Sequence, residues 1–487
     1  MKQKSLKLNF IMNAILTMSS FIFPLITFPY VSRILQPAGN GKVNFMLSVV
    51  TYFNMFAQLG IPTYGIRACA AVRDDKEKLT RTVHELLFIN VITTVLTYIV
   101  FAFAVILVPR LQQDKALAII MSFTIGFTTI GVEWLYKALE QYTYITVRSI
   151  IFKAISVLAM LMLVHAKSDY VIYGAITTFA SSASFILNMI NAHKYIGLRP
   201  VGNYHFKSHM KPVLIFFAMS IASTIYTNLD SVMLGFMKTD ADVGYYTAAV
   251  KIKTILVSLV TSLGTVLLPR AAYYIEKGEK DEFTKLSRKA MNFVILSALP
   301  LMIYFMIFAK NGIFFLSGTA YTGSIMPMQI IMPTLLFIGI SNLTGLQILV
   351  PLGQENIVLI STIIGAVVDL IINTLLIPRM ASSGAAIGTL VAEFCVTAYQ
   401  LVIVRKYIPN LFKSVSLGKI LLANGLAILA SFKIASLNMG NFFILVISAL
   451  IYFGVYLIVL LMTKESLTLS ITNQLIEKFL KGKIRGK

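Results

Sequence analysis

The chain has 487 residues, of which 57% are hydrophobic, and its formal net charge is +22. Its mean hydropathy of +0.81 lies far above that of soluble proteins. Apolar stretches long enough to cross a hydrocarbon layer of about 30 Å as a helix recur along the whole sequence. This composition excludes a soluble domain and indicates a polytopic membrane protein.

The apolar stretches predict an all-α membrane protein with about fourteen transmembrane helices. In chain order, the predicted spans are residues 9–32, 43–66, 84–108, 117–136, 145–165, 170–193, 213–236, 244–269, 290–309, 327–350, 357–377, 384–404, 420–436 and 441–462. Most Lys and Arg residues lie in the N-terminus, in alternate connecting loops and in the C-terminus. Because basic residues concentrate in cytoplasmic loops, this asymmetry predicts that both termini are cytoplasmic.

The first predicted span contains Pro24 and Pro29, and further prolines lie within or beside later spans, at Pro62, Pro300 and Pro333. Proline removes a backbone donor and interrupts the helical hydrogen-bond ladder, so we expect a bent first helix. The same reasoning predicts bends at the later prolines. Such bends serve either as hinges or as static features of the fold.

The basic charge indicates membrane topology and contact with anionic lipid headgroups, not a nucleic-acid partner. Cys69 and Cys395 are the two cysteines, and no Cys/His cluster accompanies them, so the sequence predicts no metal site and no disulfide framework. Neither a phosphate-binding loop nor a catalytic triad is recognisable. We therefore expect no enzymatic activity and no cofactor.

A weak internal repeat relates spans 1–6 to spans 7–12. At an offset of 203 residues, Gly41 aligns with Gly244 and Arg67 aligns with Arg270; at an offset of 214, Glu133 aligns with Gln347. Because six spans are an even number, both halves enter the membrane from the same side. Parallel repeats of this kind surround a substrate site in many transporters, so we expect a central cavity.

The predicted organisation follows from this repeat. It comprises an N-terminal six-helix lobe (1–195), a basic cytoplasmic linker (196–212), a C-terminal six-helix lobe (213–408), two further transmembrane helices (409–463) and a basic cytoplasmic tail (464–487). The tail is expected to lie on the inner membrane leaflet, because it is basic and amphipathic.

Charged residues near the ends of spans 7 and 8 are the first candidates for a functional site. Asp230 lies about six residues inside the end of one span, and Lys251 and Lys253 lie about as deep in the next. Two interpretations are compatible: an Asp230–Lys251 ion pair that holds two helices together, and a hydrated transport path lined by these groups. Lys251 and Lys253 are about 200° apart on a helix, so only one can face a cavity.

Further charges lie within other predicted spans. Lys153 is in span 5, and Asp369 and Glu393 are in spans 11 and 12. The two carboxylates could couple transport to protons, or each could face a separate cation or a water-filled lumen. Cations in a cavity would suit an anionic phosphate or diphosphate group, for which Arg is well shaped. Arg33, Arg67 and Arg270 are candidates for this role, and interfacial anchoring is the alternative.

Several motifs of the chain resemble those of the bacterial polysaccharide flippases of the multidrug/oligosaccharidyl-lipid/polysaccharide exporter superfamily. The motifs are FPYVSRILQPAGNGKVNF (28–45), QLGIPTYGIRACA (58–70), EWLYKALEQYTYITVRSIIFK (133–153), NLDSVMLG (228–235), VGYYTAAVKI (243–252) and GAAIGTLVAEF (384–394). The positions that carry the resemblance are Tyr30, Arg33, Gly41, Gly65, Arg67, Glu133, Asp230, Gly244, Tyr245, Lys251 and Glu393. An acidic residue common after the GIR element in this family is replaced here by Ala68, Cys69 and Ala70.

The resemblance implies two six-helix lobes around a central cavity and transport by alternating access. Its implied substrate is an undecaprenyl-diphosphate-linked oligosaccharide, flipped from the cytoplasmic to the outer leaflet of the bacterial cytoplasmic membrane. It also implies membrane lipids, a polysaccharide polymerase and glycosyltransferases as partners. Two alternatives remain: a cation-coupled multidrug antiporter with its site at Asp369 or Glu393, and a membrane scaffold without transport activity.

Overall fold

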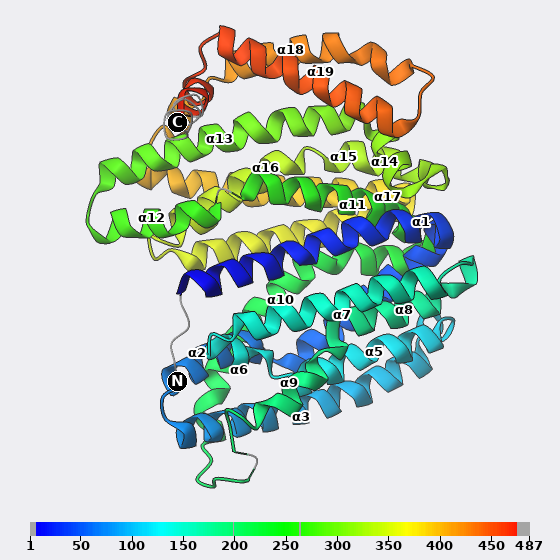
Figure 1. The fold of residues 1–487 in the computed structure, drawn as a ribbon, viewed down its shortest axis with the longest axis vertical. Coiled ribbons are helices and arrows are strands. Elements are labelled where there is room, and N and C mark those ends of the chain that lie inside the picture. Colours follow the sequence, from blue (N-terminus) through cyan, green and yellow to red (C-terminus); the bar gives the residue numbers. More distant parts are fainter. Residues whose placement is uncertain (1–5, 198, 263, 475–487) are drawn as a thin grey trace, which may run out of the picture. The chain divides into compact units, whose positions relative to one another are not determined.

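The computed structural model describes residues 6–197, 199–262 and 264–474, and within these ranges all regular secondary structure is helical (Figure 1). The chain divides into two compact units, Met1–Thr247 and Ala248–Lys487. Among the described residues, ten helices are long and apolar enough to cross a membrane, or eleven when the bent pair Thr319–Ile331 and Thr334–Leu349 counts as one span. The prediction of an all-α membrane protein is confirmed.

The first unit is built from ten α-helices, two short helical segments and the first turns of α11. They are α1 (Leu6–Gln58), α2 (Ile61–Ala71), α3 (Lys76–Leu107), α4 (Pro109–Gln112), α5 (Lys115–Ile130), α6 (Glu133–Ala138), α7 (Tyr142–Leu163), η1 (Lys167–Asp169), α8 (Tyr170–Thr178), the π-helical η2 (Phe179–Ala183), α9 (Phe185–Ala192), α10 (Phe206–Met237) and α11 (Asp240–Thr261). The helix α10 thus begins within the segment assigned to the linker.

The second unit contains the remainder of α11 and the helices that follow it. They are α12 (Gly264–Glu276), α13 (Lys280–Ile307), α14 (Ala309–Ser317), η3 (Thr319–Ser324), α15 (Ile325–Ile331), α16 (Thr334–Asn342), the π-helical η4 (Leu343–Leu349), α17 (Glu355–Tyr407), η5 (Leu411–Ser414), α18 (Leu417–Ser431), η6 (Phe432–Ser436) and α19 (Asn441–Met462). Most of the predicted basic tail, residues 475–487, lies outside the described residues.

The helices α1 and α17 each continue through a sharp backbone break. Both have 53 residues, which would extend about 80 Å if straight, far beyond a hydrocarbon layer of about 30 Å. Gln36 interrupts α1 with φ 58° and ψ −179°, directly before Pro37, where a following proline disfavours the helical conformation. Ala381 interrupts α17 with φ 47°, three residues after Pro378.

The prolines differ in their effect on the helices. Backbone dihedrals in α1 remain helical at Pro24 and Pro29, and its non-helical residue is Gln36. Pro300 lies inside α13. The predicted bend at Pro333 is confirmed, because the helices on either side of the break meet at 48°.

The count of ten or eleven candidate spans is smaller than the fourteen intervals predicted by hydropathy, although helices cover all fourteen intervals. Two physical features account for the difference. Each of α1 and α17 passes as one continuous helix through a break, and α5 has 16 residues, fewer than a membrane-crossing helix usually needs.

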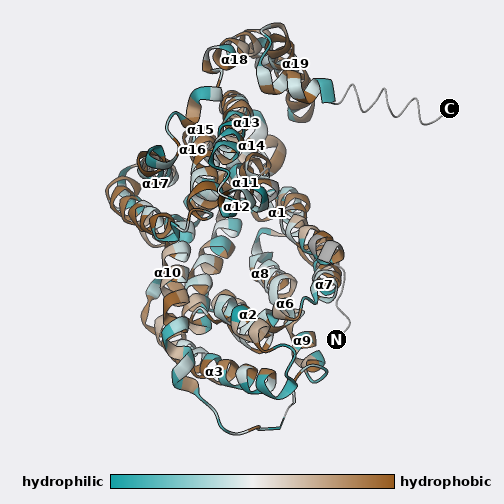
Figure 2. Ribbon diagram, turned by 90° about the vertical axis from the view of Figure 1, so that its left-hand side faces the viewer, coloured by the Kyte–Doolittle hydropathy of each residue, from teal (hydrophilic) through white to brown (hydrophobic). Residues whose placement is uncertain are grey.

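Apolar side chains cover the outside of many helices, as expected for a chain that is solvated by lipid. Figure 2 shows hydrophobic residues along most ribbons, including α3, α17 and α19. Leu107 at the end of α3, Leu429 on α18 and Met462 at the end of α19 are each more than two-thirds exposed. Such exposure carries no cost in hydrocarbon, because lipid tails are as apolar as these side chains.

In the first unit, Gly60 marks a close crossing of the α1–α2 connection and α10. Gly60 has φ 74°, and a Cβ added to it would lie 2.4 Å from the backbone nitrogen of Phe217. A residue without a Cβ is therefore needed at this position. The connection continues into α2, and Asp75 then caps α3 by accepting hydrogen bonds from the backbone N–H groups of Glu77 and Lys78, both at 3.1 Å.

In the second unit, buried tyrosines connect α19 to α13 and α18. Tyr304 donates its hydroxyl proton to the Leu445 carbonyl at 2.8 Å, and Tyr452 donates to Asn424 Oδ1 at 2.6 Å. Tyr456 donates to the Leu296 carbonyl at 2.9 Å. Buried hydroxyl groups need such partners, so these bonds fix how α19 packs against the unit.

Glu465, just beyond α19, is fully buried and receives a set of hydrogen bonds. Its carboxylate accepts from Asn292 Nδ2 at 2.8 Å and from the backbone N–H and hydroxyl of Thr468, both at 2.7 Å. Burial alone raises the pKa of Glu465, but these hydrogen bonds outweigh it and hold the pKa below the ordinary value of 4.5. The carboxylate thereby ties the segment after α19 to α13.

We expect Glu465→Gln to lower the free energy of unfolding of the second unit by about 1–3 kcal/mol at pH 7, because buried donors lose a charged acceptor. Since the folded-state pKa is the lower one, the stabilisation is present above the unfolded pKa and disappears as pH falls through the folded pKa. Thermal denaturation of the detergent-solubilised protein should show the difference between wild type and variant shrinking below about pH 5.

The exposed Glu282 on α13, paired with Lys285 at 2.7 Å, supplies the control. Glu282→Gln is expected to change stability little, since exposed ion pairs contribute little. Equal stability of wild type and Glu465→Gln at pH 7 would contradict the assigned role of Glu465.

Candidate functional site

Lys153 lies in the middle of α7 and is held by α1. Its ammonium group donates to Ser19 Oγ at 2.9 Å and Ser20 Oγ at 3.1 Å, and it lies 5.9 Å from the ring centroid of Phe23. Both serine hydroxyls donate to the Leu16 carbonyl, which leaves their oxygen lone pairs available to the ammonium group. Two hydroxyl oxygens accept hydrogen bonds from Lys153 without cancelling its charge.

Glu133, at the start of α6, lies between two cations. Its carboxylate is 2.8 Å from Lys137 Nζ and 3.1 Å from Arg148 Nη2. The buried Arg148 also donates to the Ser184 carbonyl at 3.3 Å, and its guanidinium lies 5.1 Å from the ring centroid of Phe185. This cluster joins α6, α7 and the end of η2, a π-helical turn of a type that is frequent at functional sites.

Sequence reasoning missed Arg148, although it lies within predicted span 5, five residues before Lys153. The available signal was a cation inside an otherwise apolar stretch. Its pairing with Glu133 depends on the αL conformation of Val132, which has φ 36° and begins α6. That turn redirects Glu133 relative to α5.

Tyr30 and Arg33 lie near the end of the first part of α1. The Tyr30 hydroxyl donates to the Val164 carbonyl at 2.9 Å, at the end of α7. Arg33 is exposed, and its Nη1 donates to the Pro29 carbonyl at 2.6 Å. The exposed Arg67 is on α2, so it belongs to a different part of the same unit.

Asp230 is buried in α10 and accepts a hydrogen bond from the hydroxyl of Tyr246, on α11. Its neighbour in the sequence motif, Tyr245, is half-buried. The ion pair with Lys251 that the sequence raised for this carboxylate stays a prediction. Lys251 is half-buried and belongs to the second unit.

Asp369 and Glu393 lie on the two parts of α17, before and after the break at Ala381. Both are buried, as is Asn373, one turn after Asp369. A Cβ added to Gly388 would lie 2.9 Å from Asp369 Oδ1 and 2.2 Å from Asn373 Oδ1, so the second part of α17 packs directly on these oxygens. Arg270, on α12, is exposed and donates from Nε to Tyr274 Oη at 3.2 Å.

The described contacts therefore distribute the candidate residues over several places. Within the first unit they occupy the α1–α7 contact (Tyr30, Arg33, Lys153), the α6 cluster (Glu133), α2 (Arg67) and the α10–α11 contact (Asp230, Tyr245). Within the second unit they occupy α11 (Lys251), α12 (Arg270) and α17 (Asp369, Glu393).

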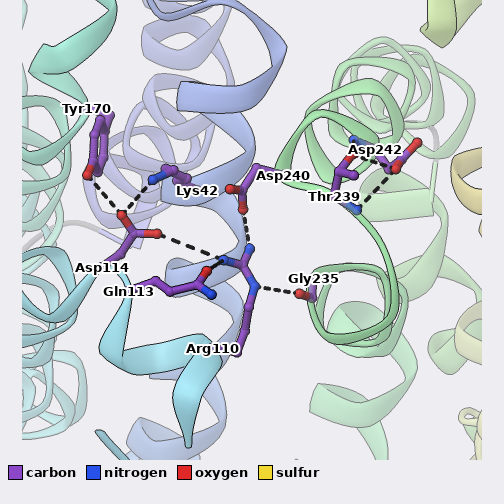
Figure 3. Close-up of polar contacts among 9 residues, drawn as sticks. All are labelled: Lys42, Arg110, Gln113, Asp114, Tyr170, Gly235, Thr239, Asp240 and Asp242. Atoms are coloured by element: carbon purple, nitrogen blue, oxygen red, sulfur yellow. Dashed lines mark hydrogen bonds and ion pairs between the residues drawn. The ribbon is translucent and has the colours of Figure 1, made fainter.

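A polar cluster that sequence reasoning missed joins Lys42, just after the break in α1, to residues at the ends of α4, α5, α8 and α11 (Figure 3). We define the loop-end cluster as Lys42, Arg110, Asp114, Tyr170 and Asp240. Asp114 accepts from Lys42 Nζ at 2.8 Å and from the Tyr170 hydroxyl at 2.9 Å, and Arg110 Nη1 lies 4.0 Å away. Arg110 also pairs with Asp240 through Nη2.

A second polar cluster ties the beginning of α10 to α2 and α3. His209 Nε2 lies 2.7 Å from Glu85 Oε2, and its Nδ1 lies 2.8 Å from the Tyr64 hydroxyl. The other carboxylate oxygen of Glu85 accepts from the backbone N–H of His205 at 2.5 Å. Glu85 and His209 are both buried, so this cluster is well shielded from solvent.

Comparison with known proteins gives consistent matches. A family model described as "Polysaccharide biosynthesis protein" matches residues 6–275. A putative O-antigen transporter of Escherichia coli (strain K12) is 25% identical over 405 residues, which cover 82% of this chain and 97% of the relative. Both matches were found from the amino-acid sequence alone.

Two solved structures share the fold. The structure titled "Lipid II flippase MurJ, inward closed conformation" aligns with a TM-score of 0.73 and 18% identity, over 92% of this chain and 98% of that one. An inward-facing multidrug resistance MATE family transporter of the MOP superfamily aligns with a TM-score of 0.60 and 15% identity, over 82% of this chain and 98% of that one.

The contact between Gly388 and the buried polar pair on α17 can be tested by adding one methyl group. We expect Gly388→Ala to destabilise the second unit by about 1–3 kcal/mol, because its Cβ would overlap Asn373 Oδ1 and neither part of α17 can retreat freely. The thermal denaturation midpoint of the purified protein measures this effect.

The matched control is Gly425→Ala on α18, where a Cβ would meet nothing within 4 Å. We expect this control to leave the midpoint unchanged or raise it, since alanine favours a helix over glycine. A Gly388→Ala midpoint equal to that of Gly425→Ala would contradict the close packing of the two parts of α17.

Proposed function

The chain belongs to the polysaccharide biosynthesis protein family, and on that premise we propose that it flips undecaprenyl-diphosphate-linked oligosaccharide repeat units across the bacterial cytoplasmic membrane. The substrate would move from the cytoplasmic to the outer leaflet by alternating access, for cell-surface polysaccharide synthesis. The observation that carries this proposal is the likeness to the putative O-antigen transporter over most of both chains. The family is one of transmembrane transporters, not of enzymes.

The proposed topology has fourteen crossings with both termini in the cytoplasm. It follows when α1 and α17 are each divided at their breaks, the bent pair is counted as one span and the short α5 is included. The proposed organisation keeps two six-helix lobes (1–195 and 213–408) around a central cavity, a linker (196–212), two further helices (409–463) and a basic tail (464–487).

A parallel repeat is supported by two matching turns. Glu140, after α6, has φ 55° and Gly353, after η4, has φ 70°. In each turn the next residue donates its backbone N–H to the carbonyl five residues earlier, Gln141 to Tyr136 and Gln354 to Leu349, both at 2.9 Å. The separation of 213 residues agrees closely with the sequence repeat.

Most of the proposed substrate contacts are cationic. A diphosphate group carries negative charge and accepts several hydrogen bonds, which Arg and Lys side chains can donate. Lys153 supports the assignment, because hydroxyl groups hold it without neutralising its charge. The proposed substrate-binding residues are Arg33, Asp230, Lys251, Lys153, Arg67, Arg270, Tyr30 and Tyr245.

Asp369, Glu393 and Glu133 are proposed as residues that couple transport to an ion. The burial of Asp369 and Glu393 supports this role, since a buried carboxylate must bind a proton or a cation, or accept hydrogen bonds. Glu133 already has two cationic partners, so it is the weakest of the three candidates.

The leaflet that holds the lipid-linked oligosaccharide tests the proposed activity. After depletion of the protein we expect lipid-linked oligosaccharide to accumulate on the cytoplasmic side, because synthesis continues while flipping stops. Digestion by a membrane-impermeant glycosidase in right-side-out and inside-out vesicles measures this distribution. Unchanged export together with greater sensitivity to cationic compounds would contradict the flippase and support the multidrug antiporter instead.

The cationic contacts are tested by Arg33→Gln and Lys251→Gln. Each should lower glycan export at least about tenfold at normal protein level, the effect of losing one charge-assisted hydrogen bond of about 1.4 kcal/mol or more. The matched control is Lys253→Gln, on the same helix but about 200° away from Lys251, which should export normally. Normal export by both test variants would remove the cationic-site hypothesis.

A further inference from the structure

Two glycines bring the second part of α1 and the first turn of α11 into backbone contact. A Cβ added to Gly41 would lie 1.7 Å from the carbonyl oxygen of Asp240, and a Cβ added to Gly244 would lie 2.1 Å from the carbonyl oxygen of Pro37. No side chain can occupy either space without moving the backbone. All four residues belong to the first unit.

This contact is reciprocal in the internal repeat. Gly41 and Gly244 are 203 residues apart, as are Pro37 and Asp240. Pro37 lies four positions before Gly41, and its repeat equivalent Asp240 lies four positions before Gly244. Gly41 packs against Asp240, and Gly244 packs against Pro37, so the two contacts are equivalent in the repeat. The same patch of each half touches the same patch of the other, as in a symmetric dimer interface.

Arg110 adds a charged bridge beside the glycine contact (Figure 3). It pairs with Asp240 and donates from Nε to the Gly235 carbonyl at 2.7 Å, so it holds both sides of the α10–α11 turn. Its guanidinium also lies 4.8 Å from the ring centroid of Phe45, on α1. Gln113 Oε1 accepts from Arg110 Nη1 at 3.1 Å and orients it.

We propose that Arg110, Asp240 and the glycine pair form a releasable latch that joins the break in α1, α4 and the α10–α11 turn on the outer side and opens once in every transport cycle. The latch rests on the proposed function and its topology, in which these connections face the outside. Arg110 and Asp240 are positioning residues: they control which side of the membrane the path faces and do not touch the substrate.

The contacts of Asp114 differ from the Arg110–Asp240 pair in their burial and in the elements they join. Asp114 is 6% exposed and is bound by Lys42 and Tyr170, all from elements that precede α10. Arg110 and Asp240 are 17% and 19% exposed, so the pair that leads to the α10–α11 turn is less shielded than Asp114, and in the proposed topology it faces the outer aqueous side. A partly hydrated ion pair contributes little net free energy and can exchange its partner for water.

The glycine contact can also be released at little cost in free energy. Because neither helix inserts a side chain into the other at Gly41 and Gly244, the two backbones can separate without changes of side-chain rotamer. The contact provides close fit in the closed state, and the ion pair provides most of its specificity. Together they form an interface that can open and close repeatedly.

A cysteine reporter beneath the contact measures opening. Thr247 is buried three residues after Gly244 on the same side of α11, so Thr247→Cys is shielded while the latch is closed. The background is Cys69→Ala with Cys395→Ala in the full-length chain. A membrane-impermeant maleimide added to the outside of intact cells labels the reporter when the outer ends separate.

We expect Asp240→Asn and Arg110→Gln each to raise the labelling rate at least about fivefold over the parent reporter, a typical size for a coupling between two conformations. The double variant should label no faster than either single variant, because both remove the same bridge. Gly41→Ala and Gly244→Ala should raise the rate as well, since neither permits full closure.

Asp242→Asn is the matched control, because Asp242 lies in the same turn and accepts from the backbone N–H and hydroxyl of Thr239 at 3.2 and 2.7 Å, a contact within that turn. The control should label at the parent rate. The latch is wrong if Asp240→Asn labels at the parent rate at equal protein level, or if Asp242→Asn labels as fast as Asp240→Asn.

Cysteine labelling and the leaflet distribution of the glycan test the latch and the flippase activity separately. If the latch is wrong, labelling of the variants does not change, and dependence of glycan export on the protein persists. If the flippase proposal is wrong, the leaflet distribution of lipid-linked oligosaccharide does not depend on the protein, whereas the labelling differences remain.

Discussion

Ionisable side chains within a hydrocarbon layer are tolerated when the protein supplies their partners, and this constraint determines which helices of the chain must lie together. Lys153 requires the hydroxyls of α1, Arg148 requires Glu133 of α6, and Asp230 receives the hydroxyl of Tyr246. Each pairing joins two elements whose apolar surfaces alone would pack in many ways. The polar residues thus select one arrangement from many that lipid would accept.

The kind of partner decides whether a charged side chain is neutralised or keeps its charge. Arg148 is paired with Glu133, whose carboxylate also contacts Lys137, so these side chains hold α6 and α7 together. Lys153 is held by neutral hydroxyls, and an anion that approaches it meets a full positive charge. Neighbouring cations on α7 therefore have different surroundings: Arg148 is paired with a carboxylate, and Lys153 is held by hydroxyl groups.

Hydropathy correctly predicted an all-helical membrane protein, because the apolar length of a span is a local property of the sequence. The repeat matched Gly41 with Gly244, yet only the structure revealed that these glycines touch, since the match reports equivalence and not contact. Arg148 and the pair Arg110–Asp240 were missed for a related reason. Their importance depends on partners that are 15 and 130 positions away. Hydropathy windows also cannot detect helices that continue through Gln36 or Ala381.

The two ends of α10 are held in different ways, and this difference gives its motion a direction. At its beginning, the side chains of His209 and Glu85 are 10% and 5% exposed, and Tyr64 completes a shielded cluster. At its end, the Gly235 carbonyl and the adjoining turn are held by Arg110, whose pair with Asp240 is more exposed, at 17% and 19%. Buried polar pairs are costly to separate, because each group would lose its partner without gaining water, whereas hydrated pairs are not. Within the first unit, α10 should therefore pivot about its His209 end while the Gly235 end moves.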